Sequence, residues 1–195
     1  MKKLLPVSRL LLFFASISMV ILFFVPFWQI LMWAPQYPEG LNMKIWINNI
    51  TGDVDIINGL NHYIGMKHIK VEMFPEFKIM PWLVGVLIAF GLTASLIGKK
   101  SLLVTFFVLL ILLGIAGLVD YYQWGYDYGH NLDPKAAISV PGMSYQPPMI
   151  GTKILLNFTA YSGPDTGGWI MVVAGILTGI AIGIEFFKNR SPKII

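Results

Sequence analysis

Two histidines and a methionine lie close together in the string His62-Tyr-Ile-Gly-Met66-Lys-His68. Imidazole and thioether groups are borderline and soft ligands, which suit Cu(I). If the string is helical, the spacing of four places His62 and Met66 on one face, and His68 follows two residues later. The string therefore predicts a Cu(I) site made by His62, Met66 and His68.

The same string allows a second interpretation that needs no metal. Three histidines in the whole chain are not many, and a His–Met spacing of four arises easily by chance. In that case the three side chains are solvated or lie at an interface. His130, Met143 and Met149 belong to a later segment and show no comparable spacing.

Other kinds of chemistry find little support in the sequence. The chain has no cysteine, which excludes disulfides, thiolate metal sites and thiol nucleophiles. It also lacks a glycine-rich phosphate loop, a serine nucleophile elbow and an HExxH motif. We therefore expect a protein that is not an enzyme. No nucleic-acid partner is expected either, because the basic residues flank apolar segments.

The composition sets the environment in which these residues act. Hydrophobic residues make up 56% of the chain and charged residues 12%, whereas a soluble domain normally has about 25% charged residues. Apolar runs long enough to cross a bilayer indicate membrane lipid as the main solvent. We expect an all-α membrane protein, a single domain over 1–195 built as a four-transmembrane-helix bundle. Its predicted spans are about 10–32, 81–98, 101–119 and 169–187.

The basic residues beside these spans predict their orientation. They all fall on one side in the four-span arrangement: Lys2, Lys3, Arg9, Lys99, Lys100, Lys188, Arg190 and Lys193. By the positive-inside rule this side is cytoplasmic. We therefore expect a protein of the inner (cytoplasmic) membrane with both termini in the cytoplasm. The two loops, 33–80 and 120–168, then face outward and are expected to form a small cap.

Small residues on the fourth span suggest how the helices pack. Gly175, Gly179 and Gly183 recur every four residues, which places them on one face where another helix can approach closely. This stripe either holds the bundle together or forms a docking face for a partner subunit. The spans contain almost no charged residues, which argues against a proton relay, an ion channel or a coupled transporter.

Several strings in the predicted loops resemble those of a known group of proteins. They are Tyr37-Pro-Glu-Gly-Leu41, Gly52-Asp-Val, Ile57-Asn-Gly-Leu-Asn-His-Tyr-Ile-Gly-Met66 and Ser162-Gly-Pro-Asp-Thr-Gly-Gly-Trp169. The chain thereby resembles small four-span membrane accessory proteins associated with nitrous-oxide reductase maturation. The resemblance covers most of both loops. It implies an accessory role in assembling a periplasmic copper enzyme, with His62, Met66 and His68 as the positions carried over.

Three functions follow from these observations. The first is a membrane accessory protein that holds or passes Cu(I) at the outer face for maturation of a copper-containing respiratory enzyme. The second is a structural or docking subunit of a larger membrane complex, without metal binding. The third is a quinone-interacting membrane protein that uses Tyr121, Tyr122 and Trp124 with a histidine. Copper titration separates the first from the second.

Overall fold

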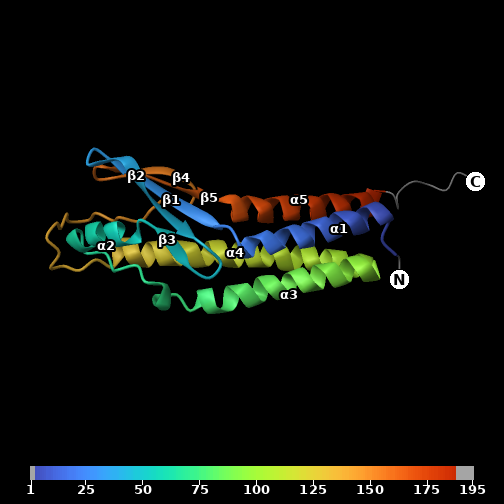
Figure 1. The fold of residues 1–195 in the computed structure, drawn as a ribbon. Helices are drawn as coiled ribbons and strands as arrows, with labels where there is room; N and C mark the ends of the chain where they lie inside the picture. Colours follow the sequence, from blue (N-terminus) through green and yellow to red (C-terminus); the bar gives the residue numbers. More distant parts are fainter. Residues whose placement is uncertain (1–2, 188–195) are drawn as a thin grey trace, which may run out of the picture.

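A computed structural model describes residues 3–187 and contains four long apolar helices (Figure 1). The first is α1, continued by a short 3-10 helix η1, and the others are α3, α4 and α5. Each is long and apolar enough to cross a membrane. Their bounds are Pro6–Ser18 for α1, Met19–Phe23 for η1, Glu76–Ile97 for α3, Lys100–His130 for α4 and Thr166–Phe187 for α5.

Helix α1 packs against both α3 and α5 within the bundle. Leu12 and Ala15 of α1 and Met19 of η1 are fully buried, and Phe106 of α4 is buried in the same cluster. Outward-facing positions on all four helices are also apolar. A bundle that is apolar on its outside as well as inside is typical of helices surrounded by lipid.

A five-stranded antiparallel sheet lies beyond one end of the bundle (Figure 1). Its strand order is β3-β2-β1-β5-β4, so β1 pairs with β2 on one side and β5 on the other. The strands span Trp28–Ala34 for β1, Tyr37–Ile45 for β2, Ile50–Gly52 for β3, Gly151–Leu155 for β4 and Phe158–Pro164 for β5. Strand β1 follows α1 and η1 directly, and β5 leads directly into α5.

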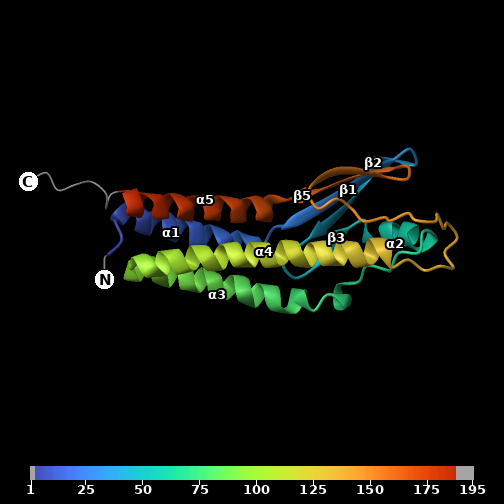
Figure 2. The same cartoon turned by 180° about the vertical axis from the view of Figure 1, so that it is seen from behind.

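Helix α2 (Val54–Tyr63) and the outer end of α4 lie beside this sheet (Figure 2). Buried residues from all three meet in one apolar cluster, which includes Ile30, Met43, Ile57 and Tyr128. A short 3-10 helix η2 (Val71–Met73) then connects this region to α3. We call the sheet, α2, the outer end of α4 and their connecting segments the cap.

Polar contacts tie the cap to the helices. The indole Nε1 of Trp28 donates to the Ser162 hydroxyl at 2.8 Å, and the Tyr121 hydroxyl shares a hydrogen bond of 2.7 Å with it. Ser162 is completely buried. These three residues belong to β1, β5 and α4, so one buried hydroxyl joins the centre of the sheet to the longest helix.

The sequence prediction of an all-α four-transmembrane-helix bundle is wrong, because the structure mixes helices with a five-stranded sheet. The apolar run predicted as a span over 10–32 stops being helical at Phe23, and residues from Trp28 onward form β1. Pro26 has no backbone N–H, so it cannot continue the helical hydrogen bonding. The run 101–119 is instead longer than predicted, since α4 continues to His130.

The opposite end of the bundle is held together by charged and backbone groups. The Lys100 ammonium lies 2.5 Å from the buried Glu185 carboxylate, and the Leu5 amide donates to the same carboxylate at 2.7 Å. Arg9 donates to the Ser95 and Leu96 carbonyls at the end of α3. This end therefore joins all four helices.

The close helix contact occurs on α3 and not on the glycine stripe of α5. A Cβ atom added at Gly91 would overlap the Ser16 hydroxyl and the Phe106 ring. One added at Gly175 or Gly183 would meet nothing within 4 Å among the described residues. Gly91 is thus a position where α1, α3 and α4 approach closely.

Candidate metal-binding site

The two histidines of the predicted copper site come from α2 and the segment that follows it. His62 lies on the exposed side of the last turn of α2, while Ile57, Asn58 and Asn61 face inward. The chain reverses at Gly65, whose φ of +79° is a left-handed conformation that favours glycine. The segment after this turn runs back along α2, which brings His68 beside His62.

The buried side chain of Asn58 fixes this return path. Its Nδ2 donates to the Ile69 carbonyl at 2.9 Å, and its Oδ1 accepts from the Ile69 amide at 2.7 Å. Both backbone groups of a residue next to His68 are therefore held by one side chain of α2. Buried backbone groups need such partners, so this double contact determines where the segment lies.

The imidazoles of His62 and His68 lie edge to face at the surface of the cap. Their ring centroids are 6.2 Å apart, with an angle of 70° between the ring planes. Both side chains are exposed. Two imidazoles that bind one ion with metal–nitrogen bonds of about 2.0 Å have centroids on the order of 5–6.5 Å apart. The centroid separation of the pair falls within this range.

Met66 occupies a different environment. Its half-buried side chain packs against the apolar cluster of the cap, with Leu60 and Val71 as other members of the same layer. The structure thus brings His62 and His68 together at the surface, whereas Met66 contributes to the core beneath them. Within the described residues, no group of three or more His, Cys, Asp and Glu side chains is placed to hold a metal.

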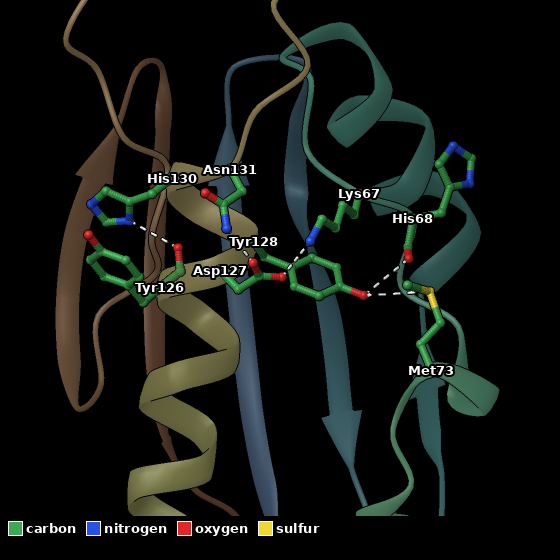
Figure 3. A network of polar contacts seen from close by, with 8 residues as sticks. All are labelled: Lys67, His68, Met73, Tyr126, Asp127, Tyr128, His130 and Asn131. Carbon is green, nitrogen blue, oxygen red and sulfur yellow. Dashed lines mark hydrogen bonds and ion pairs between the residues drawn. The ribbon is translucent and has the colours of Figure 1, made fainter.

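Contacts with the outer end of α4 support the segment that carries His68 (Figure 3). The Tyr128 hydroxyl donates to the His68 carbonyl at 3.2 Å and lies 3.8 Å from the Met73 sulfur. The imidazole of His68 points away from this hydroxyl. Burial raises the pKa of Tyr128, so its hydroxyl stays a neutral donor at physiological pH.

An ion pair lies on the same segment. The Lys67 ammonium is 2.6 Å from the Asp127 carboxylate, and Asn131 also donates to that carboxylate. The hydrogen bond from Lys67, more than any other contact, lowers the pKa of Asp127. A carboxylate whose pKa is lowered by folding stabilises the fold when the pH is above the pKa of an unfolded aspartate, about 3.9. This stabilisation is lost as the pH falls through the lower pKa of the folded state. The carboxylate is therefore ionised at neutral pH, as an ion pair with Lys67 requires.

His130 is not brought to this site. Its ring stacks on Tyr126, with centroids 4.0 Å apart, and its Nδ1 lies 3.0 Å from the Tyr126 carbonyl. Figure 3 shows His130 and His68 on opposite sides of α4. Met143 and Met149 lie exposed in the segment between α4 and β4.

The aromatic residues considered for quinone binding belong mostly to the cap interior. Tyr121 and Trp124 are half-buried and pack against the apolar cluster of the cap, while Tyr122 is exposed. Trp124 contacts Tyr128 with ring centroids 5.1 Å apart. These rings fill the space between α4 and the sheet.

Sequence reasoning missed Asn58, Lys67 and Asp127 as residues that position the site. Asparagine inside a helix carries no signal for a contact eleven residues away, and Lys67 and Asp127 are sixty residues apart. No known family model matches this chain, and comparison with curated proteins and with solved structures likewise finds no match.

Proposed function

We propose that this chain is an integral protein of the inner (cytoplasmic) membrane, with four spans, both termini in the cytoplasm and the cap outside. Helix α1 begins and α5 ends at the end of the bundle away from the sheet (Figure 1). Lys3, Arg9, Lys99 and Lys100 lie near these helix ends. Basic residues accumulate on the cytoplasmic side of membrane proteins, which supports this orientation.

Aromatic residues support a membrane boundary at the base of the cap. Phe24, Trp82 and Trp169 are strongly exposed and lie near the cap ends of η1, α3 and α5. Exposed tryptophans of this kind gather at membrane–water interfaces. From Trp169 to Phe187, α5 rises by about 27 Å at 1.5 Å per residue, which is close to the ~30 Å of a hydrocarbon core.

On this outer cap we propose that His62 and His68 hold Cu(I), which the protein passes to a copper-containing respiratory enzyme during its maturation. The carrying observation is the pair of exposed imidazoles at 6.2 Å. They are positioned by backbone contacts outside the rings, so both rings keep a nitrogen for a metal. Because the pair is exposed, a partner protein can reach a bound ion. The resemblance of the loop strings to the maturation accessory proteins favours the same function.

Replacing both histidines tests this function. The parent in detergent is expected to take one Cu(I) per chain from a colorimetric Cu(I) chelator, and His62→Ala with His68→Ala is expected to abolish this uptake. His130→Ala is the matched control and should bind as the parent does, because His130 lies across α4 from the pair. Met66→Leu should also retain binding, since its side chain packs in the cap core.

Failure of the parent to bind Cu(I) stoichiometrically contradicts the proposal, as does unchanged binding by the double variant. Either result favours the docking subunit. A specific feature supports that second function: β4 is an edge strand of the sheet, and Ile150, Ile154 and Leu156 in or beside it are exposed. An apolar edge strand can accept a strand from another protein.

A further inference from the structure

A groove lies between the inner ends of α4 and α5, at the end of the bundle away from the cap. Its volume is about 390 Å³. Leu103, Val104, Ile182 and Phe186 form its apolar walls, and Lys100 and Ser101 lie at its polar end. Phe186 and Val104 are exposed to the surroundings of the bundle, so the groove opens toward the lipid in the proposed arrangement.

The Lys100 ammonium is held at this polar end by Glu185. Its Nζ lies 2.5 Å from one carboxylate oxygen and donates to the Glu185 backbone carbonyl at 3.2 Å. An ammonium group has three protons, so one remains beyond these two contacts. Glu185 is almost fully buried, whereas the Lys100 side chain keeps 26% of its surface exposed. The arrangement thus fixes a cation beside an apolar groove.

The charge of this end of the bundle favours an anion. Among the described residues, this end of the bundle carries four positive charges, on Lys3, Arg9, Lys99 and Lys100, and one negative charge on Glu185. A soluble anion could use the charges but not the apolar walls. An amphipathic ligand with a negative headgroup matches both parts of the groove.

We propose that this groove binds an anionic phospholipid. An acyl chain packs against Leu103, Val104, Ile182 and Phe186, and the phosphate accepts hydrogen bonds from Lys100 and the Ser101 hydroxyl. The inference rests on the membrane-spanning arrangement of the proposed function and does not depend on copper. Failure of the lipid site would therefore leave the copper test unaffected, and the reverse is also true.

Native mass spectrometry of the full chain in neutral detergent tests this site with an equal mixture of dioleoylphosphatidylglycerol and dioleoylphosphatidylcholine. We expect the parent to retain the phosphatidylglycerol about fivefold more strongly, as one well-placed cation allows. Ser101→Glu should remove this preference, because it places a carboxylate at the phosphate position. The variant should still fold, since an acidic residue in the first turn of a helix is favourable.

Lys99→Gln is the matched control because it changes the net charge by the same amount at an exposed residue that does not line the groove. It should keep the preference for phosphatidylglycerol. Equal retention of both lipids by the parent would overturn the proposal. Equal loss in the two variants would overturn it too, since it would indicate diffuse attraction. Displacement of the lipid by inorganic phosphate would indicate a site for a soluble anion instead.

Discussion

At the scale of single residues, the proposed copper ligands depend on a side chain that binds no copper itself. Asn58 holds both backbone groups of Ile69, and His68 precedes Ile69 directly. His62 lies one helical turn after Asn58 on α2. The separation of the two imidazoles is therefore set by a buried amide that lies beneath them.

Replacing Asn58 with alanine should destabilise the cap and weaken Cu(I) binding together. The Ile69 amide and carbonyl would lose their partners in a buried position, which costs about 1–3 kcal/mol for each group left unsatisfied. His68 would then move relative to His62. Thermal unfolding in detergent and chelator competition measure the two effects.

Asn157→Ala is the appropriate control. Its exposed side chain donates to the Gln36 side chain at the surface, so its loss should change stability by no more than about 0.5 kcal/mol. An Asn58→Ala variant that unfolds earlier but binds Cu(I) as tightly as the parent would show that the spacing of the imidazoles does not matter.

Two of the three residues that the sequence proposed as ligands lie close together in the structure. His62 and His68 do come together, but through a reversal at Gly65 and not through a shared helix face. Met66 was grouped with them because the string was considered as a helix. Its place in the cap core depends on packing against residues of β1, β2 and α4, which no short string contains.

At the scale of elements, the helices follow from local sequence patterns, whereas the strands depend on pairing between distant residues. The apolar runs of α3, α4 and α5 were recognised because length and hydropathy suffice to identify them. Strand β1 was hidden at the end of an apolar run, since Trp28, Ile30 and Leu31 suit either a span or a strand. Its pairing joins Trp28 to Pro164, and such distant pairing leaves no mark in a local pattern.

Helix packing offers a direct comparison between two glycines. Gly91→Ala should destabilise the bundle by about 1–3 kcal/mol, because the added methyl group overlaps Ser16 and Phe106 in a packed core. Gly183→Ala should leave stability unchanged or slightly increased, since its Cβ meets nothing within 4 Å and alanine favours helix. Thermal unfolding and size-exclusion chromatography of both variants in detergent provide the measurement.

The result also decides how the bundle is held together. Loss of stability at Gly183 with none at Gly91 would mean that the α5 stripe makes the close contact after all. The expected result places that contact where α1, α3 and α4 meet. In the α5 stripe, a Cβ at Gly179 would make only an ordinary van der Waals contact with Phe107, and one at Gly175 or Gly183 would meet nothing within 4 Å among the described residues.

At the scale of the whole molecule, the sheet is connected to the bundle at several places. Strand β1 follows α1 and η1 within a few residues, β5 passes directly into α5, and α4 extends from the bundle into the cap. The buried Ser162 contacts join these three connections. From Asp120 to His130, α4 rises by about 15 Å at 1.5 Å per residue. The end of α4 that contacts the His68 carbonyl through Tyr128 therefore lies beyond the proposed membrane surface.

The proposed orientation can be tested with single cysteines, because the chain contains none of its own. Ile154→Cys lies on the strongly exposed edge strand β4, and Lys99→Cys lies in the exposed turn between α3 and α4. If the cap lies outside, a membrane-impermeant maleimide should label Ile154→Cys in intact cells whose inner membrane is accessible to the reagent. It should label Lys99→Cys only after permeabilisation. Labelling of both after permeabilisation is the control for accessibility. The reverse pattern would place the cap in the cytoplasm, where His62 and His68 could not serve a periplasmic enzyme.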